Sequence, residues 1–253
     1  MSDFEATLDM PSLGVLNGSK ETVQIRPMTV REEKILLSKS LTPGDKFLKI
    51  ITSSSDIADP NEAKRLPMSD VMFLFIKLRN LSVGSSGYRN KVSCSMCDQS
   101  FQWEIDLNTQ DVKQLKSEEE PYTAELPRCG KKVTLKHMRL QDQIDVDKMA
   151  RTRKSLAVGG INDPNFLSER LAALIVSVDG NDKALFAEKC KFVDSLITQD
   201  MQILNDTMAD HDFGIDLRTT ATCPHCDSTD EYLVRLDPTF FRSPRKLSET
   251  DGN

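Results

Sequence analysis

The sequence predicts an α+β protein that is mostly helical and internally duplicated, with the order strand, helices, Cys-x-x-Cys knuckle and strand occurring twice. Three observations lead to this prediction: two Cys-x-x-Cys pairs, matching residues around them, and helical spacing of apolar residues between them. A small zinc-ribbon-like β element is expected to join the two halves.

Length and composition allow a buried core. The chain has 253 residues, of which 38% are hydrophobic and 28% are charged, as in ordinary globular proteins. The apolar run at residues 71–78 is shorter than the roughly 20 residues of a membrane span, and the acidic N-terminus lacks an export signal. We therefore expect neither a membrane partner nor secretion. A net charge of −6 without a basic segment argues against nucleic acid as a partner.

Turn and capping residues mark the first strands and helices. Residues 1–20 are predicted to form an extension with a hairpin, because Asn17-Gly18 lies between apolar segments. Thr29 followed by Glu32 is a capping box that opens a helix over "VREEKILLSKS". Ser69 is the predicted N-cap of "DVMFLFIKLRNLS", which is apolar nearly all round and is therefore expected to be buried.

The first half, residues 21–110, ends with the knuckle of Cys94 and Cys97 and the strand after it. Its segment "VSCSMCDQSFQWEIDL" overlies "ATCPHCDSTDEYLVRL" at an offset of 129 residues, so that Cys94 matches Cys223 and Cys97 matches Cys226. Both pairs precede apolar residues that alternate with polar ones, as in a half-buried strand. Further upstream, "VQIRPMTVREE" overlies "VTLKHMRLQDQ" at an offset of 110 residues. Two matches in the same order favour duplication over coincidence.

The second half, residues 132–241, follows a polar connection at residues 111–131. The connection is predicted to hold a strand at Tyr122–Leu126 and a turn at Cys129-Gly130. Apolar spacing then predicts helices at 164–178, at 181–197 with Cys190 as a buried small hydrophobe, and at 199–210 with Met201, Leu204 and Met208 on one face. Residues 156–165 are predicted to be a loop and residues 242–253 a disordered tail.

The four matched cysteines, Cys94, Cys97, Cys223 and Cys226, are candidate ligands of one structural zinc ion. Structural zinc takes four protein ligands in a tetrahedron, and two related halves packed about a pseudo-two-fold axis would bring equivalent knuckles together. A disulfide-exchange centre is disfavoured, because a strand-like segment follows Cys226 where such centres have a helix. An empty or disulfide-linked site is the other alternative. His225 is expected to be an exposed spacer.

Taken together, "IRPMTVREEKILLSKS", "SDVMFLFIKLRNLSVG" and the two knuckles with their strands resemble the baseplate hub subunit, or hub assembly protein, of T4-type contractile-tailed bacteriophages. The resemblance covers residues 20–241. It implies a non-enzymatic role in building the baseplate hub, or in escorting hub and tape-measure proteins, within the cytoplasm of the infected bacterium. A permanent component would also be part of the virion tail. No small-molecule substrate is implied.

Two aromatic residues near the end of the chain, Phe240 and Phe241, are candidate partner-binding residues. Packing against the protein's own core is the alternative for both. The protein is also a candidate oligomer. A zinc-ribbon nucleic-acid-binding accessory protein is the second functional hypothesis, and a thiol oxidoreductase is the third.

Overall fold

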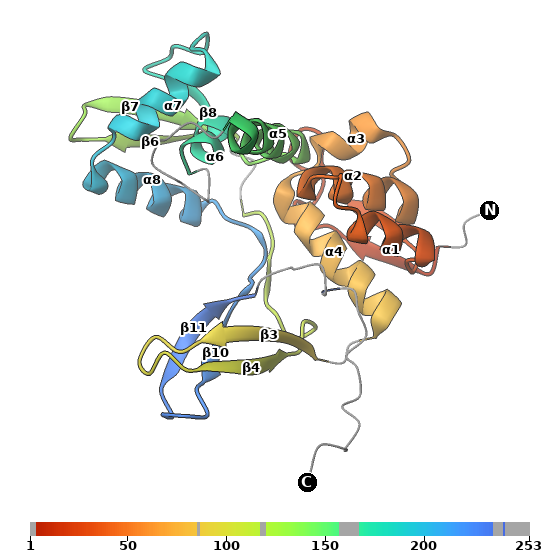
Figure 1. Cartoon of the computed structure of the whole chain (residues 1–253). Coiled ribbons are helices and arrows are strands. Elements are labelled where there is room, and N and C mark those ends of the chain that lie inside the picture. The colour runs from red at the N-terminus through yellow and green to blue at the C-terminus, as the bar shows by residue number, and fades with distance from the viewer. Residues whose placement is uncertain (1–3, 85–86, 117–119, 157–166, 235–239, 241–253) are drawn as a thin grey trace.

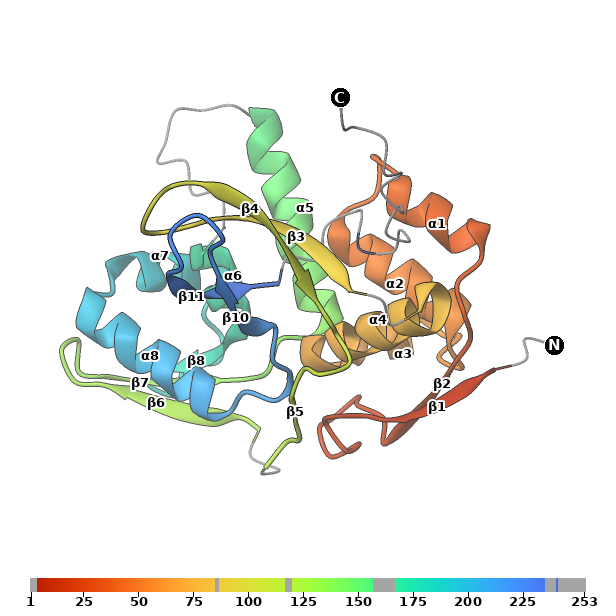
Figure 2. The same ribbon diagram turned by 90° about the horizontal axis from the view of Figure 1, so that it is seen from below.

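The computed structural model describes residues 4–84, 87–116, 120–156, 167–234 and 240. Within them the fold is α+β, as predicted: helices are combined with two- and three-stranded antiparallel sheets. Two helical lobes lie side by side, and two β-hairpins project together from beneath them (Figure 1). The same hairpins lie in front of the lobes when the molecule is seen from below (Figure 2).

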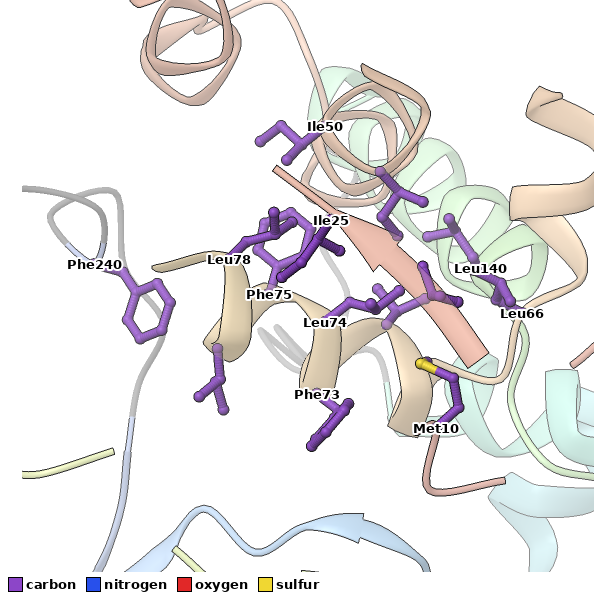
Figure 3. Close-up of a cluster of buried hydrophobic side chains, with 14 of the residues drawn as sticks. Met10, Ile25, Ile50, Leu66, Phe73, Leu74, Phe75, Leu78, Leu140 and Phe240 are labelled. Atoms are coloured by element: carbon purple, nitrogen blue, oxygen red, sulfur yellow. The ribbon is translucent and has the colours of Figure 1, made fainter. Parts of the chain in front are cut away.

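The first lobe is formed by the N-terminal part of the chain. It contains the antiparallel hairpin of β1 (Ala6–Asp9) and β2 (Thr22–Ile25), followed by α1 (Val30–Leu37), α2 (Pro43–Ser54), α3 (Pro60–Arg65) and α4 (Met68–Val83). The predicted capping box of Thr29 and Glu32 opens α1. Helix α4 is buried, as its apolar character predicted, and Figure 3 shows its residues Leu74, Phe75 and Leu78 in the same cluster as Ile25 of β2.

Two local predictions in the first lobe are wrong. Strands β1 and β2 are separated by residues 10–21, so Asn17-Gly18 is not a tight turn between paired strands. The apolar residues before it form turns instead, in which Leu16 is buried. Helix α4 begins at Met68 and has no side-chain cap. The Met68 N–H donates to the carbonyl of Met138 at 2.8 Å, so this long-range contact replaces the expected cap at Ser69.

The second lobe is a three-stranded sheet covered by helices. Its elements are β6 (Tyr122–Leu126), β7 (Lys131–Leu135), α6 (Leu167–Leu174), β8 (Ile175–Val178), α7 (Phe186–Ser195) and α8 (Thr198–Asp210), with strand order β6-β7-β8. The predicted strand and turn before residue 131 are confirmed, since Gly130 has φ +68° and donates to the carbonyl of Leu126 at 2.8 Å. The face of α8 with Met201, Leu204 and Met208 packs into the core of this lobe, as predicted.

Two predictions in the second lobe need correction. The helix expected over residues 164–178 ends at Leu174, and Ile175–Val178 form β8 instead. Three of those four residues are β-branched, which favours a strand, and β8 pairs with β7. Cys190 is half-buried on α7, not fully buried. The expected loop at 156–165, apart from its first residue, and the expected tail at 242–253 lie outside the described residues.

Helix α5 (Leu140–Leu156) joins the lobes, and both views place it between them (Figures 1 and 2). It packs against α2 and α3 of the first lobe and against α6 of the second. The Asp147 carboxylate on α5 accepts a hydrogen bond from the Gly44 N–H at the start of α2 at 2.7 Å. Helix α5 therefore joins the lobes by packing against both of them.

The projecting hairpins, together called the ribbon, come from distant parts of the sequence. One is formed by β3 (Tyr88–Ser93) and β4 (Ser100–Ile105), and the other by β10 (Arg218–Thr222) and β11 (Thr229–Leu233). The chain segments that lead to and from the ribbon also pair, through β5 (Val112–Lys113) and β9 (Gly214–Ile215). None of the helices in the described residues combines the length and apolar character that crossing a bilayer requires.

Candidate metal centre

The first Cys-x-x-Cys pair forms the turn of the β3–β4 hairpin. The strands pair up to Ser93 and Ser100, and Cys94 then closes the turn. Its N–H donates to the carbonyl of Gln99 at 3.0 Å, and its own carbonyl accepts from the Asp98 N–H at 3.0 Å. Asp98 has φ +57°, a left-handed conformation that aspartate tolerates better than most residues. The result is a tight knuckle with both cysteines on the turn.

The second pair forms the same kind of turn in the β10–β11 hairpin. The Cys223 N–H donates to the carbonyl of Ser228 at 2.8 Å, and the Cys223 carbonyl accepts from the Asp227 N–H at 3.0 Å. Asp227 has φ +56°, within one degree of the value at Asp98. The two knuckles therefore have matching backbone hydrogen bonds.

The ribbon brings the four predicted ligand sulfurs together, all within 4.8 Å of one another. Across the two hairpins, the Sγ atoms of Cys94 and Cys226 are 3.6 Å apart, and those of Cys97 and Cys223 are 3.8 Å apart. Sulfurs bound at about 2.3 Å to a tetrahedral zinc ion are separated by about 3.8 Å, whereas a disulfide bond is about 2.05 Å long. The spacing can hold a metal ion and does not correspond to disulfides.

Backbone donors point at the first sulfur of each knuckle. The Met96 N–H donates to Cys94 Sγ at 3.4 Å, and the His225 N–H donates to Cys223 Sγ at 3.4 Å. Donors of this kind stabilise a thiolate, which is the form that binds metal. His225 itself is exposed, as predicted, so its backbone contributes to the site and its imidazole does not.

Ser228 lies beside two sulfurs from different hairpins. Its hydroxyl is 3.3 Å from Cys94 Sγ and 3.2 Å from Cys226 Sγ, and it lowers the pKa of both thiols, that of Cys94 to about 6 with the help of backbone N–H groups. The Gln99 N–H lowers the pKa of Cys97, but burial and the neighbouring sulfurs raise it on balance to about 12. A negative charge on one of the four close thiols therefore disfavours deprotonation of the others. A divalent cation would allow all four to bind as thiolates.

A small apolar cluster surrounds the inner side of the site. Cys94 is 1% exposed and Cys223 is 0% exposed, whereas Cys226 is exposed. The Tyr232 ring of one hairpin packs against Phe101 and Trp103 of the other, with ring centroids 6.0 Å apart in both cases. Two-stranded hairpins with so small a core are marginally stable on their own, and a bound metal would link them.

The two aromatic candidates have different outcomes. Phe240 is 1% exposed and belongs to the core of the first lobe, which is the alternative placement considered for it. Its ring lies 5.0 Å from the Tyr88 ring, and its carbonyl accepts a hydrogen bond from Arg79 Nε at 2.7 Å. Figure 3 shows Phe240 approaching the end of the helix that carries Leu78. Phe241 lies outside the described residues.

Sequence reasoning missed two residues that organise this region. Ser228 has no matching residue in the first knuckle, where Gln99 occupies the equivalent place, so aligning the two knuckles gave no signal for it. Arg79 was detectable as a charged residue on a helix that is apolar nearly all round. It is 1% exposed, with its guanidinium carbon 5.4 Å from the ring centroids of both Tyr88 and Phe240.

Comparison with known protein families gives a match over most of the chain. The family model described as T4 bacteriophage base plate protein matches residues 1–242. No curated protein and no solved structure matches the chain. Because the family match takes in both lobes and both knuckles, the chain belongs to the T4 bacteriophage base plate protein family.

Proposed function

We propose that this protein is a non-enzymatic structural or assembly component of the baseplate hub of a contractile phage tail. In this proposal, Cys94, Cys97, Cys223 and Cys226 bind one structural zinc ion. The observation that carries the zinc site is that four sulfurs lie within 4.8 Å of one another, two from each of two hairpins that are far apart in the sequence. The family match supports the baseplate role. Filling all four zinc positions with protein ligands leaves none for a substrate, which is the pattern of a structural site.

The zinc ion would fix the arrangement of the lobes. The β3–β4 hairpin follows α4 of the first lobe, and the β10–β11 hairpin follows α8 of the second. A metal that binds both hairpins therefore closes a link between the lobes in addition to α5. Structural zinc contributes roughly 10–16 kcal/mol in small peptides. A rigid two-lobed body of this kind suits a protein whose role is to present fixed surfaces to its neighbours.

The duplication is also part of the proposal, and a pair of buried aspartates supports it. Asp70 and Asp200 are each the third residue of a helix, α4 and α8, and both are 0% exposed. Asp70 accepts hydrogen bonds from the N–H and the hydroxyl of Ser12 in the β1–β2 connection. Asp200 accepts hydrogen bonds from the N–H groups of Arg128 and Cys129 in the β6–β7 turn. Each half thus has a hairpin held by the aspartate of a later helix.

This equivalence refines the boundaries of the two halves. The halves expected at residues 21–110 and 132–241 begin at their second strands, β2 and β7. We propose that β1 belongs to the first half and β6 to the second. Each half then has the order hairpin, helices, aspartate-bearing helix and knuckle hairpin. The connection at residues 111–131 consequently contains the first strand of the second half.

The partners implied by this role are other baseplate components, and we propose hub and tape-measure proteins among them. A permanent component would be found in the virion tail, and a transient assembly factor would be confined to the host cytoplasm. The acidic residues beside the second knuckle, Asp227, Asp230 and Glu231, do not favour binding to nucleic acid phosphates.

The experiment combines metal analysis with assembly. Native mass spectrometry of the full chain should show one zinc ion per molecule, which Cys94→Ser removes and Cys129→Ser, at an exposed cysteine outside the site, retains. Introduced into the phage genome, Cys94→Ser should reduce the yield of complete baseplates, and Cys129→Ser should not. A chain that binds no metal but supports normal baseplates would contradict the zinc proposal. Normal infection without the gene would contradict the assembly role.

A further inference from the structure

The four sulfurs of the metal centre are not equivalent. Cys226 is exposed, whereas Cys94 is buried. Their sulfurs are 3.6 Å apart, although the two residues lie on different hairpins and 132 positions apart in the chain. Forming a disulfide of about 2.05 Å would require the two sulfurs to approach by about 1.5 Å.

Contacts that do not involve the metal also hold the two hairpins together. The Ser95 hydroxyl on the first knuckle donates to the Asp230 carboxylate on the second hairpin at 2.5 Å. Tyr232 of the second hairpin also packs against Phe101 and Trp103 of the first. Loss of the metal would therefore leave Cys94 and Cys226 facing each other.

We propose that hydrogen peroxide converts the metal centre into a disulfide between Cys94 and Cys226, with release of the zinc ion. This inference rests on the proposed zinc site. The metal cross-link between the two hairpins is thereby replaced by a covalent cross-link between the same hairpins. A protein made in a reducing cytoplasm and carried in particles outside the cell would keep its ribbon closed in both environments.

The chemical steps balance. The exposed Cys226 thiolate attacks one oxygen of the peroxide, so that an S–O bond forms, the O–O bond breaks and hydroxide leaves. The Cys94 thiolate then attacks the Cys226 sulfenic acid, so that the S–S bond forms, the S–O bond breaks and a second hydroxide leaves. Two electrons pass from the two thiolates to the peroxide. Forming the disulfide would break the bonds of Cys94 and Cys226 to a bound zinc ion, and the two remaining ligands, Cys97 and Cys223, would not retain it against a chelator.

The test uses the full chain carrying Cys129→Ser and Cys190→Ser, so that only the four site cysteines can react. After its zinc content is measured, the protein is treated with equimolar hydrogen peroxide in the presence of a chromophoric zinc chelator, and then digested without reduction. We expect release of one zinc ion per chain and one disulfide joining the peptides of Cys94 and Cys226. We also expect a higher Tm for the oxidised chain than for the reduced, zinc-free chain.

Several results would overturn the inference. These are a disulfide within either knuckle, a Cys97–Cys223 disulfide, sulfinic acid as the main product, or retention of zinc after excess peroxide. If the chain contains zinc at the start and any of these is observed, the inference fails and the zinc proposal stands. If the chain as purified from a reducing lysate contains no zinc, the proposed metal site fails first.

Discussion

The two lobes differ in how far each depends on the rest of the chain. The core of the second lobe is built from residues between Tyr122 and Leu204. The core of the first lobe also includes Leu140 and Ile144 of α5, together with Val234 and Phe240 from the end of the described chain. The second lobe can therefore bury its core from its own segment. The first lobe cannot complete its core until nearly the whole chain is present.

The two buried aspartates, Asp70 in the first lobe and Asp200 in the second, differ in the direction of their pKa shifts. Burial raises the pKa of Asp70 to about 6, although hydrogen bonds from Ser12 and the charge of Arg139 oppose the increase. Burial also raises the pKa of Asp200, but the N–H groups of Arg128 and Cys129 outweigh it and the net pKa is lowered. Burial alone does not decide the charge of a carboxylate. At Asp70 the loss of hydration outweighs the hydrogen bonds, whereas at Asp200 the hydrogen bonds outweigh the loss of hydration.

The largest expected effect tests whether the two knuckles contribute equally to the proposed zinc site. Cys94→Ser and Cys223→Ser each remove the buried first cysteine of one knuckle, and each should abolish zinc binding and lower Tm by about 10 °C or more. Calorimetry with parallel zinc analysis measures both effects. Since the two knuckles have matching hydrogen bonds, the two losses should be alike, with Cys129→Ser as the unaffected control. A loss of zinc in one variant alone would show that the halves contribute unequally.

A smaller effect tests how the chain end completes the first lobe. Phe240→Ala removes a ring that is 1% exposed and packs on Tyr88, which should lower the free energy of unfolding by about 3–5 kcal/mol. Hydrogen exchange should accelerate in α4 and leave β6–β8 unchanged. Leu204→Ala, in the core of the second lobe, is the matched control and should do the reverse. Uniform acceleration throughout both lobes would contradict independent cores.

Local signals predicted the local features of this fold. The Thr29–Glu32 capping box, the strand at Tyr122–Leu126 and the two knuckles depend on neighbouring residues, and all are found where expected. The predictions that failed depended on distant partners. The cap expected at Ser69 is replaced by a bond to Met138, and Ile175–Val178 become a strand because β7 is available for pairing.

Two buried charged residues that the sequence did not single out, Asp70 and Arg79, are held by the same kind of distant contact. Asp70 is bound by Ser12, 58 positions away, and Arg79 by Phe240, 161 positions away. A single sequence records neither pairing. The cysteines could be aligned from the sequence, because two short motifs of fixed spacing are recognisable without knowing the path of the chain between them.

The pKa of Asp70 predicts a pH-dependent stability. Since the folded chain binds this proton more tightly than the unfolded chain, Asp70 stabilises the fold below pH 4, and that contribution is lost as pH rises through about 6. The change from a pKa of 3.8 to about 6 corresponds to about 3 kcal/mol. Asp70→Asn should remove this dependence and stabilise the protein relative to wild type at pH 8. Urea denaturation at pH 4 and pH 8 measures it, and parallel pH profiles for the two proteins would refute it.

Asp200→Asn should change the stability of the fold least, and in the opposite direction to Asp70→Asn. A carboxylate accepts from the N–H groups of both Arg128 and Cys129, at 3.1 and 2.8 Å, whereas an amide has one oxygen and would turn its NH2 group toward the other donor. Because the folded pKa is lowered, the stabilisation by Asp200 is present above pH 4 and lost as pH falls through the folded pKa. The variant should therefore melt about 5 °C lower than wild type at pH 7, with a smaller difference in acid. If Asp70→Asn and Asp200→Asn shifted stability in the same direction at pH 8, the balance of burial and hydrogen bonds at each carboxylate would not be what sets its charge, and the contrast between the two lobes would lose its physical basis.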